Sequence, residues 1–189
     1  KSNQEFNQER IYSFYRNVSD IYEEVGNNIK SKEYLKLSIN RLVKSNEKDG
    51  DYYMEEAELD IANEDFVKAK ENLIKAEEIY VIEESYDDLF YLYSYAITLA
   101  SQNIIFANED YHYFLELISQ IKPHLSYEAS IDAEFTEAQV FIQEANWNKV
   151  IEIIKKVNPK IKENTYNHLT SKWMLALCYF QTGELDRGL

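Results

Sequence analysis

Apolar residues recur at intervals of three and four along most of the chain, the spacing that puts them on one face of an α-helix. The clearest stretch is WMLALCYFQTG, residues 173–183, in which Leu175, Ala176 and Tyr179 share a face and Gly183 ends the helix. Leu185 then opens a further helix, three residues before the small residue Gly188. The pattern predicts a helix, a tight turn and a second helix.

The same succession of helix, turn and helix recurs along the chain. We expect units at approximately 11–45, 50–82, 88–123, 128–160 and 167–189. The second helices carry apolar or small residues at spacings of three and four: Ser31, Leu35, Ser38 and Leu42; Phe66, Ala69, Leu73 and Ala76; and Val150, Ile154 and Val157. In the third unit the turn NIIFANED is long, and we expect its Asn108 to cap a helix with Tyr111, Phe114, Leu115 and Ile118 on its apolar face.

Each first helix contains one small residue at a regular interval. These residues are Ser19, Ala57, Ala96, Ala138 and Ala176, separated by 38, 39, 42 and 38 positions. A small residue followed by an aromatic at three and a glycine at seven, as in Ser19, Tyr22 and Gly26, resembles the first helix and turn of the tetratricopeptide repeat (TPR) superfamily. Two features depart from that family: the repeats exceed its usual period of about 34 residues, and Asp60 replaces an aromatic in the second unit.

The resemblance implies an all-α fold, a right-handed superhelical solenoid of antiparallel helix hairpins forming one array over residues 1–189. In such an array the small residues let neighbouring helices approach closely, so a bulky replacement at Ala138 or Ala176 is expected to overpack the junction. The chain starts at Lys1 and stops at Leu189 just inside a helix, so we expect both ends to be truncated.

The net charge of −14 is concentrated in the middle of the chain. Residues 61–120 contain 12 acidic and 3 basic residues, whereas residues 121–189 contain 9 and 8. This acidity disfavours binding to nucleic acid or to anionic membranes, and the longest apolar runs are too short to span a bilayer. A single cysteine, Cys178, precludes an intrachain disulfide and fits a reducing, cytoplasmic location.

Catalytic and cofactor motifs are not evident. His112, His124 and His168 lack the spacing of a zinc site, and Cys178 has no partner set typical of a nucleophile. Adjacent acidic pairs such as Glu77–Glu78 are typical of a solvated helix surface. We therefore predict a protein that is not an enzyme and needs no cofactor or metal.

The resemblance also implies a concave groove lined by the first helices. Projecting the family's inward-facing positions onto this chain gives an acidic end and an aromatic, amide-bearing end. The projected residues are Arg16, Asn17, Asp20, Glu24, Met54, Glu55, Glu58, Tyr93, Ser94, Phe135, Gln139 and Trp173. The alternative is that Tyr93, Phe135 and Trp173 belong to the core between repeats and that the acids are ordinary surface.

These residues suggest a scaffold that binds a protein or short peptide, with basic and aromatic side chains favoured in the partner. The basic clamp by which chaperone-binding TPR domains hold a carboxylate is absent, because the matching positions hold Asp20, Glu55 and Glu58 beside Arg16. The long repeats are similar to those of bacterial regulators that sense a short peptide, which implies a signalling role. The alternative function is a structural subunit, a spacer in a multiprotein assembly, which would expose a large apolar patch on its outer surface.

Overall fold

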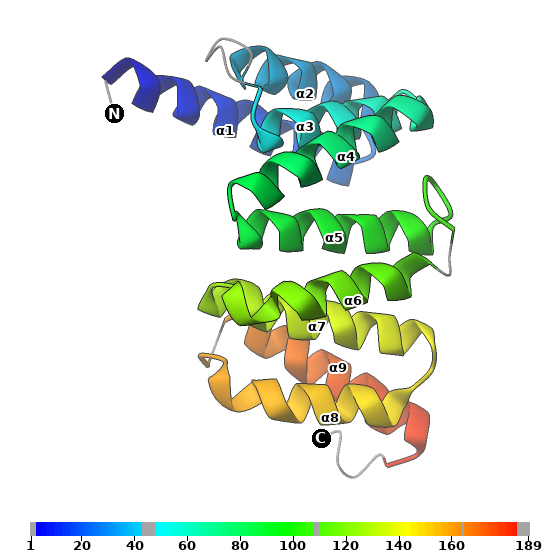
Figure 1. Ribbon diagram of the computed structural model, residues 1–189. Helices are drawn as coiled ribbons and strands as arrows, with labels where there is room; N and C mark the ends of the chain where they lie inside the picture. Colours follow the sequence, from blue (N-terminus) through cyan, green and yellow to red (C-terminus); the bar gives the residue numbers. More distant parts are fainter. Residues whose placement is uncertain (1–2, 43–47, 108–109, 164, 185–189) are drawn as a thin grey trace. The chain divides into compact units, whose positions relative to one another are not determined.

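The computed structural model describes residues 3–42, 48–107, 110–163 and 165–184, and all regular structure within them is helical (Figure 1). The α-helices are α1 (Asn3–Glu24), α2 (Asn28–Leu42), α3 (Gly50–Ala62), α4 (Phe66–Ile82), α5 (Tyr86–Ser101), α6 (Tyr111–Ile121), α7 (Tyr127–Gln143), α8 (Trp147–Val157) and α9 (Tyr166–Thr182). Two 3₁₀ turns, η3 (Lys122–His124) and η4 (Asn158–Lys160), follow α6 and α8, each with a proline that ends the preceding helix. The all-α prediction is confirmed.

The chain forms two compact units, with the boundary inside α5. Unit 1 comprises residues 1–92 and 103–105, and unit 2 comprises residues 93–102 and 106–189. In unit 1, α1 packs on α2, α2 on α3 and α3 on α4; in unit 2, α6 packs on α7, α7 on α8 and α8 on α9. Helices adjacent in sequence are therefore also neighbours in space within each of these runs. The arrangement of all units as one solenoid stays a prediction.

The turns that end α1, α3, α7 and α9 share one hydrogen-bonded geometry. After α1, Gly26 has φ 74°, its N–H donates to the Glu23 carbonyl at 2.8 Å, and the Asn27 N–H donates to the Tyr22 carbonyl at 2.8 Å. This pair of bonds is a Schellman motif, which satisfies the last carbonyls of the helix and needs a left-handed residue. The left-handed residues at the other three turns are Glu64, Ala145 and Gly183, with the same two bonds.

Every small residue singled out in the sequence lies seven positions before a residue of positive φ. The five such pairs are Ser19–Gly26, Ala57–Glu64, Ala96–Asn103, Ala138–Ala145 and Ala176–Gly183. The first four small residues are at most 1% exposed. A fixed distance between a tightly packed position and the turn is what a repeated helix hairpin requires. The structure shows that spacing and the burial of these four residues, and the repeat organisation itself stays a prediction.

Ala176 is the exception, because it is exposed. The prediction that a larger side chain there would overpack a junction is therefore wrong for the described residues. In the hairpin of α7 and α8, Ala138 is covered by the helix that follows it. The residues that follow the turn at Gly183, including Leu185 and Gly188, lie outside the described residues.

The second helices of three hairpins also share a register. Positions 5, 9 and 12 after the left-handed residue are buried in α2, α4 and α8, which gives the sets Ser31, Leu35 and Ser38; Ala69, Leu73 and Ala76; and Val150, Ile154 and Val157. Side chains at this spacing form the stripe with which one helix packs on another. Phe66, expected in the packed set, is instead 41% exposed at the start of α4.

The third unit departs from this register, as its long turn suggests. Of its predicted apolar face, Phe114 and Ile118 are buried, whereas Tyr111 and Leu115 are only half-buried. Asn108, the predicted cap, lies outside the described residues. Asp60, the acid in an aromatic position, accepts a hydrogen bond from the Asn72 side chain of α4 at 2.9 Å. A polar contact between α3 and α4 thus replaces the expected aromatic packing.

Candidate functional site

Four of the predicted groove residues meet in unit 1 as one ionic cluster, which joins α1 to α3. The Arg16 guanidinium on α1 forms two hydrogen bonds to the Glu58 carboxylate on α3, one of them 3.0 Å from Nη2 to Oε1. Its Nε lies 3.4 Å from Glu55 Oε1 and 3.6 Å from Asp20 Oδ1. The projection therefore identified residues that lie together in space, two of them more than 35 positions from Arg16 in sequence.

Glu55 is the most enclosed member of the cluster, at 7% exposure. The Tyr12 hydroxyl of α1 donates to its Oε1 at 2.8 Å, and the Ser38 hydroxyl of α2 donates to its Oε2 at 3.2 Å. Both carboxylate oxygens are thus satisfied by side chains from two other helices. Pairing and hydrogen bonding offset part of the desolvation penalty of this buried carboxylate.

The cluster contains one guanidinium and three carboxylates, so negative charge is in excess. Burial raises the pKa of Glu58 to about 7, although Arg16 acts in the opposite direction. Burial likewise raises the pKa of Glu55 and, together with the Glu55 carboxylate, that of Tyr12. Burial disfavours the charged form of Arg16 and by itself would lower its pKa. The carboxylates of Glu58, Glu55 and Asp20 have the larger combined effect and raise the pKa of Arg16.

Because Arg16 and Glu55 are engaged with each other, this cluster holds helices together more than it offers charge to a ligand. Among the neighbouring predicted residues, Asn17 and Glu24 are exposed and Met54 is half-buried. They have the accessibility that a binding surface needs, whereas Glu55 does not.

In unit 2 the predicted aromatic end of the groove is divided between core and surface. Tyr93 and Phe135 are 4% and 6% exposed; the Tyr93 ring stacks on Phe114 at 6.4 Å, and Phe135 is part of the core formed by α7, α8 and α9. Both rings are therefore packed in the interior of unit 2 and do not lie on an open surface. Trp173 and Gln139 are exposed.

Ser94 differs from the other predicted residues of unit 2. Its hydroxyl oxygen is buried and has no hydrogen-bond partner within the described part of the chain. The residue is half-buried on α5 and contributes no open surface.

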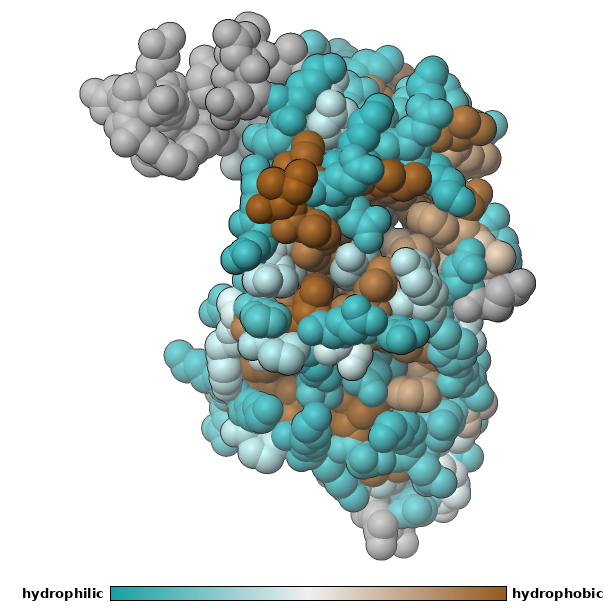
Figure 2. Space-filling model, in the orientation of Figure 1, coloured by the Kyte–Doolittle hydropathy of each residue, from teal (hydrophilic) through white to brown (hydrophobic). Residues whose placement is uncertain are grey.

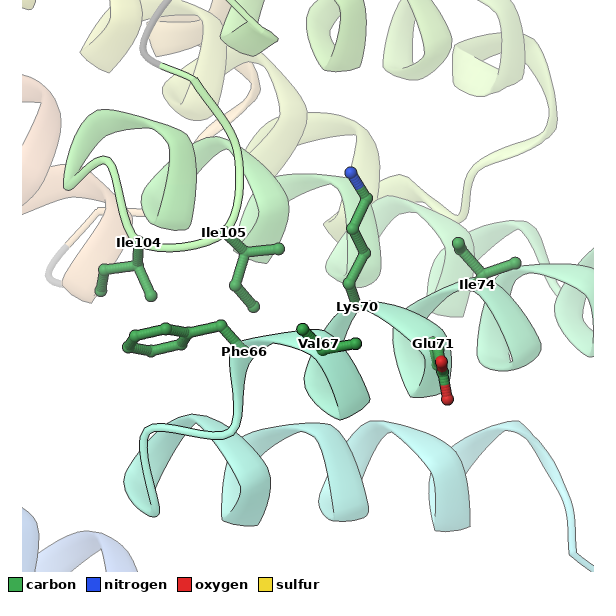
Figure 3. A pocket seen from close by; sticks show the side chains of 7 residues that line it. All are labelled: Phe66, Val67, Lys70, Glu71, Ile74, Ile104 and Ile105. Atoms are coloured by element: carbon green, nitrogen blue, oxygen red, sulfur yellow. The ribbon is translucent and has the colours of Figure 1, made fainter.

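An apolar cleft in unit 1 was not predicted from the sequence. It has a volume of about 370 Å³ and is lined by α4 and by the segment that follows α5: Phe66, Val67, Lys70, Glu71, Ile74, Ile104 and Ile105. In Figure 3 the side chains of Ile104 and Ile105 face Phe66 and Val67 across the cleft, whereas Glu71 points away. Figure 2 shows apolar residues in brown among polar residues in teal over the part of unit 1 where α4 lies.

The sequence contained one signal for this cleft. The turn NIIFANED holds two adjacent isoleucines, and apolar residues in a long turn normally cover another apolar surface. Phe66 and Val67 are 41% and 72% exposed, so the isoleucines leave part of that surface open.

A second ionic cluster lies in unit 2 and is structural. Glu134 of α7, 5% exposed, accepts from Lys156 of α8 at 2.9 Å and lies 3.0 Å from Lys122 Nζ. Burial opposes ionisation of Glu134, but the two ammonium groups outweigh it and lower its pKa. The cluster connects α7, α8 and the turn after α6.

Residues suited to catalysis or metal binding do not gather anywhere in the described ranges. No group of three His, Cys, Asp or Glu side chains there could hold a metal ion. Cys178 is buried in the core, and burial raises the pKa of its thiol, which disfavours the nucleophilic thiolate. Within the same ranges, no helix combines the length and apolar character needed to cross a membrane.

Comparisons of this chain with protein-family models, with curated proteins and with solved structures gave no match. The likeness to TPR repeats therefore depends on the residues and turns described above.

Proposed function

We propose that this chain is a non-catalytic scaffold of TPR-like helix hairpins, stacked as a right-handed superhelix, that binds a segment of a protein or peptide. The observation that carries the proposal is the repeated register: a small residue, a left-handed turn seven positions later, and a second helix buried at fixed positions. Stacked hairpins of this kind provide extended binding surfaces without catalytic groups. A cytoplasmic sensing role, as in peptide-responsive bacterial regulators, is part of the same proposal.

The cleft of unit 1 is the site that we propose for the ligand. Its volume of about 370 Å³ lies within the range of ligand pockets, and its walls are apolar except for Lys70 and Glu71. Such a cleft accommodates one or two apolar side chains of a short segment. Specificity for aromatic residues follows from the Phe66 ring, beside which a second ring can pack.

The charge around the cleft supports the earlier preference for a basic partner, but for a different reason. The acids of the Arg16 cluster are already paired, so they contribute little to recognition. Residues 61–120 nevertheless carry 12 acidic and 3 basic residues, and long-range attraction would favour a cationic peptide.

Binding of fluorescently labelled peptides, measured by anisotropy, tests this proposal. The library consists of matched peptides. In one comparison aromatic side chains are replaced by aliphatic ones, and in the other Lys or Arg is replaced by Asp or Glu. For the best binder, Val67→Glu is expected to weaken affinity about tenfold or more, because it places a charge in the cleft. Val81→Glu is the matched control: Val81 is also an exposed residue of α4 but does not line the cleft, so its effect should stay below about twofold.

Two results would contradict the proposal. Equal loss of binding with both variants would place the site elsewhere, and absence of binding by any peptide would favour the alternative function. That alternative is a structural subunit, a spacer in a multiprotein assembly.

A further inference from the structure

One face of α4 is open along the cleft of unit 1. Val67, Glu71 and Ile74 lie on this face at spacings of four and three, and all three are exposed. Val67 and Ile74 line the cleft with apolar side chains. Glu71 lies at its rim, with the carboxylate directed away from Ile104 and Ile105 (Figure 3). We call Val67, Glu71 and Ile74 the open face of α4.

The equivalent positions of α2 and α8 show that this face is not a contact surface for the next helix of the chain. Counted from the left-handed turn residue, the equivalent residues are Ile29, Glu33 and Lys36 in α2, and Asn148, Glu152 and Lys155 in α8. All six are exposed, although α2 packs on α3 and α8 packs on α9. The position of Ile74 therefore faces solvent in all three helices and holds lysine in the other two. Packing of the chain on itself does not explain an isoleucine there.

The walls of the cleft favour a helical ligand over an extended one. These walls are apolar apart from Lys70 and Glu71, and α4 uses its backbone N–H and C=O groups for its own hydrogen bonds. An extended segment held against apolar side chains would leave some of its backbone N–H and C=O groups without partners, which costs free energy. An α-helix satisfies those groups internally and presents its apolar side chains on one side.

The dimensions of the cleft fit two side chains from one face of a helix. Its lining along α4 extends from Phe66 to Ile74, a rise of about 12 Å. Side chains four residues apart on a helix are separated by about 6 Å, so two of them can enter together. The cleft volume of about 370 Å³ then holds these side chains, while the body of the ligand helix, about 10 Å across, stays outside.

The charges at the rim indicate what lies beside those apolar side chains. Lys70 extends toward the side of the cleft where Ile105 lies, whereas Glu71 is on the other side (Figure 3). A Lys or Arg residue of the ligand helix is therefore favoured on the side of Glu71. The excess of acidic residues between positions 61 and 120 acts in the same direction at longer range.

We propose that the cleft binds a basic amphipathic α-helix of a partner protein, with two apolar side chains in the cleft and a basic side chain beside Glu71. This inference rests on the proposed function and specifies the class of its ligand. It explains why α4 has Ile74 where α2 and α8 have lysine, because a lysine there would put a charge against the apolar face of the ligand.

Anisotropy of labelled peptides tests the helical conformation. The probe is an alanine-rich peptide of about 16 residues, with Phe and Leu four positions apart and Lys beside them. One matched peptide has the same composition but places Phe and Leu two positions apart, on one face of an extended strand. Another has one Ala between Phe and Leu replaced by Pro, which breaks the helix. We expect the probe to bind at least about tenfold more tightly than either matched peptide.

Charge reversal at the rim tests the basic side chain. Glu71→Lys should weaken binding of the probe about fivefold and should strengthen binding of the same peptide with Glu in place of Lys. Glu78→Lys is the matched control, because Glu78 is exposed two turns further along the same side of α4 but does not line the cleft. Its effect should stay below about twofold. Circular dichroism of both variants verifies that the chain remains folded.

The outcomes separate this inference from the proposed function. If the peptide with the extended pattern binds as tightly as the probe and is still weakened by Val67→Glu, the helical ligand is wrong but the cleft remains the binding site. Equal effects of Glu71→Lys and Glu78→Lys would overturn the basic contact at the rim. Binding of the probe that Val67→Glu leaves unchanged, or absence of binding by all of these peptides, would overturn both the inference and the cleft as the site.

Discussion

Replacing Arg16 by methionine should destabilise unit 1 strongly and in a pH-dependent way. Methionine keeps most of the side-chain volume but removes the only cation that contacts Glu55, Glu58 and Asp20 in the described structure. Removing one partner of a buried ion pair costs about 3–5 kcal/mol. The Arg16 and Glu58 side chains are 27% and 22% exposed and so keep some hydration, which brings our expectation to about 2–3 kcal/mol at pH 8.

The dependence on pH follows from Glu58. Its pKa of about 7 lies above the ordinary glutamate value of 4.5, so the folded state holds this proton more tightly than the unfolded state. The stabilisation from Glu58 protonation is complete below about pH 4.5 and is lost as the pH rises through about 7. The shift corresponds to at most about 3 kcal/mol. The loss caused by Arg16→Met should therefore be smaller near pH 5.5 than near pH 8.

Urea unfolding followed by far-UV circular dichroism at about pH 5.5 and about pH 8 measures both effects. Glu58→Gln, neutral and nearly isosteric, should flatten the pH dependence of the wild type and restore about half of the loss when combined with Arg16→Met. A loss below about 0.5 kcal/mol at pH 8, or a loss that grows as the pH falls, would show that the cluster does not stabilise the fold as described.

Two further pairs of substitutions test the repeat register by the same unfolding assay. Gly26 and Ala145 occupy the same left-handed turn position, and a Cβ at Gly26 would meet no atom within 4 Å. Gly26→Ala should therefore lower the free energy of unfolding by about 1 kcal/mol, and Ala145→Gly should raise it by about 0.5–1 kcal/mol. Changes of the same sign would contradict a shared turn. Ala138→Leu should lower the free energy of unfolding by about 1–3 kcal/mol, because Ala138 is fully buried. Ala176→Leu, on exposed surface, should change it by less than about 0.5 kcal/mol. Equal losses for the two variants would mean that Ala176 is also covered.

The ionic cluster around Arg16 could be predicted in part from the sequence, whereas the apolar cleft could not. The projection of inward-facing positions found Arg16, Glu55 and Glu58 because residues at matching positions of successive helices lie near one another. It could not indicate that these charged side chains would pair with one another, because pairing depends on their rotamers and on Tyr12 and Ser38 from two other helices. The cleft was missed because Phe66 and Ile105 are separated by nearly forty residues and approach each other only through the path of the chain after α5.

By itself, the sequence determined the helices, the turns and the small residues that mark each hairpin. These features depend on short-range physics: the helical period, and the hydrogen bonds that close a left-handed turn within six residues. Tertiary structure alone decided which apolar side chains are covered, so that Phe135 is core while Trp173, at the equivalent position of α9, faces solvent. The reason is that burial depends on whether another helix lies against that position. The spacing of apolar residues along the sequence is the same in both helices and does not reveal this.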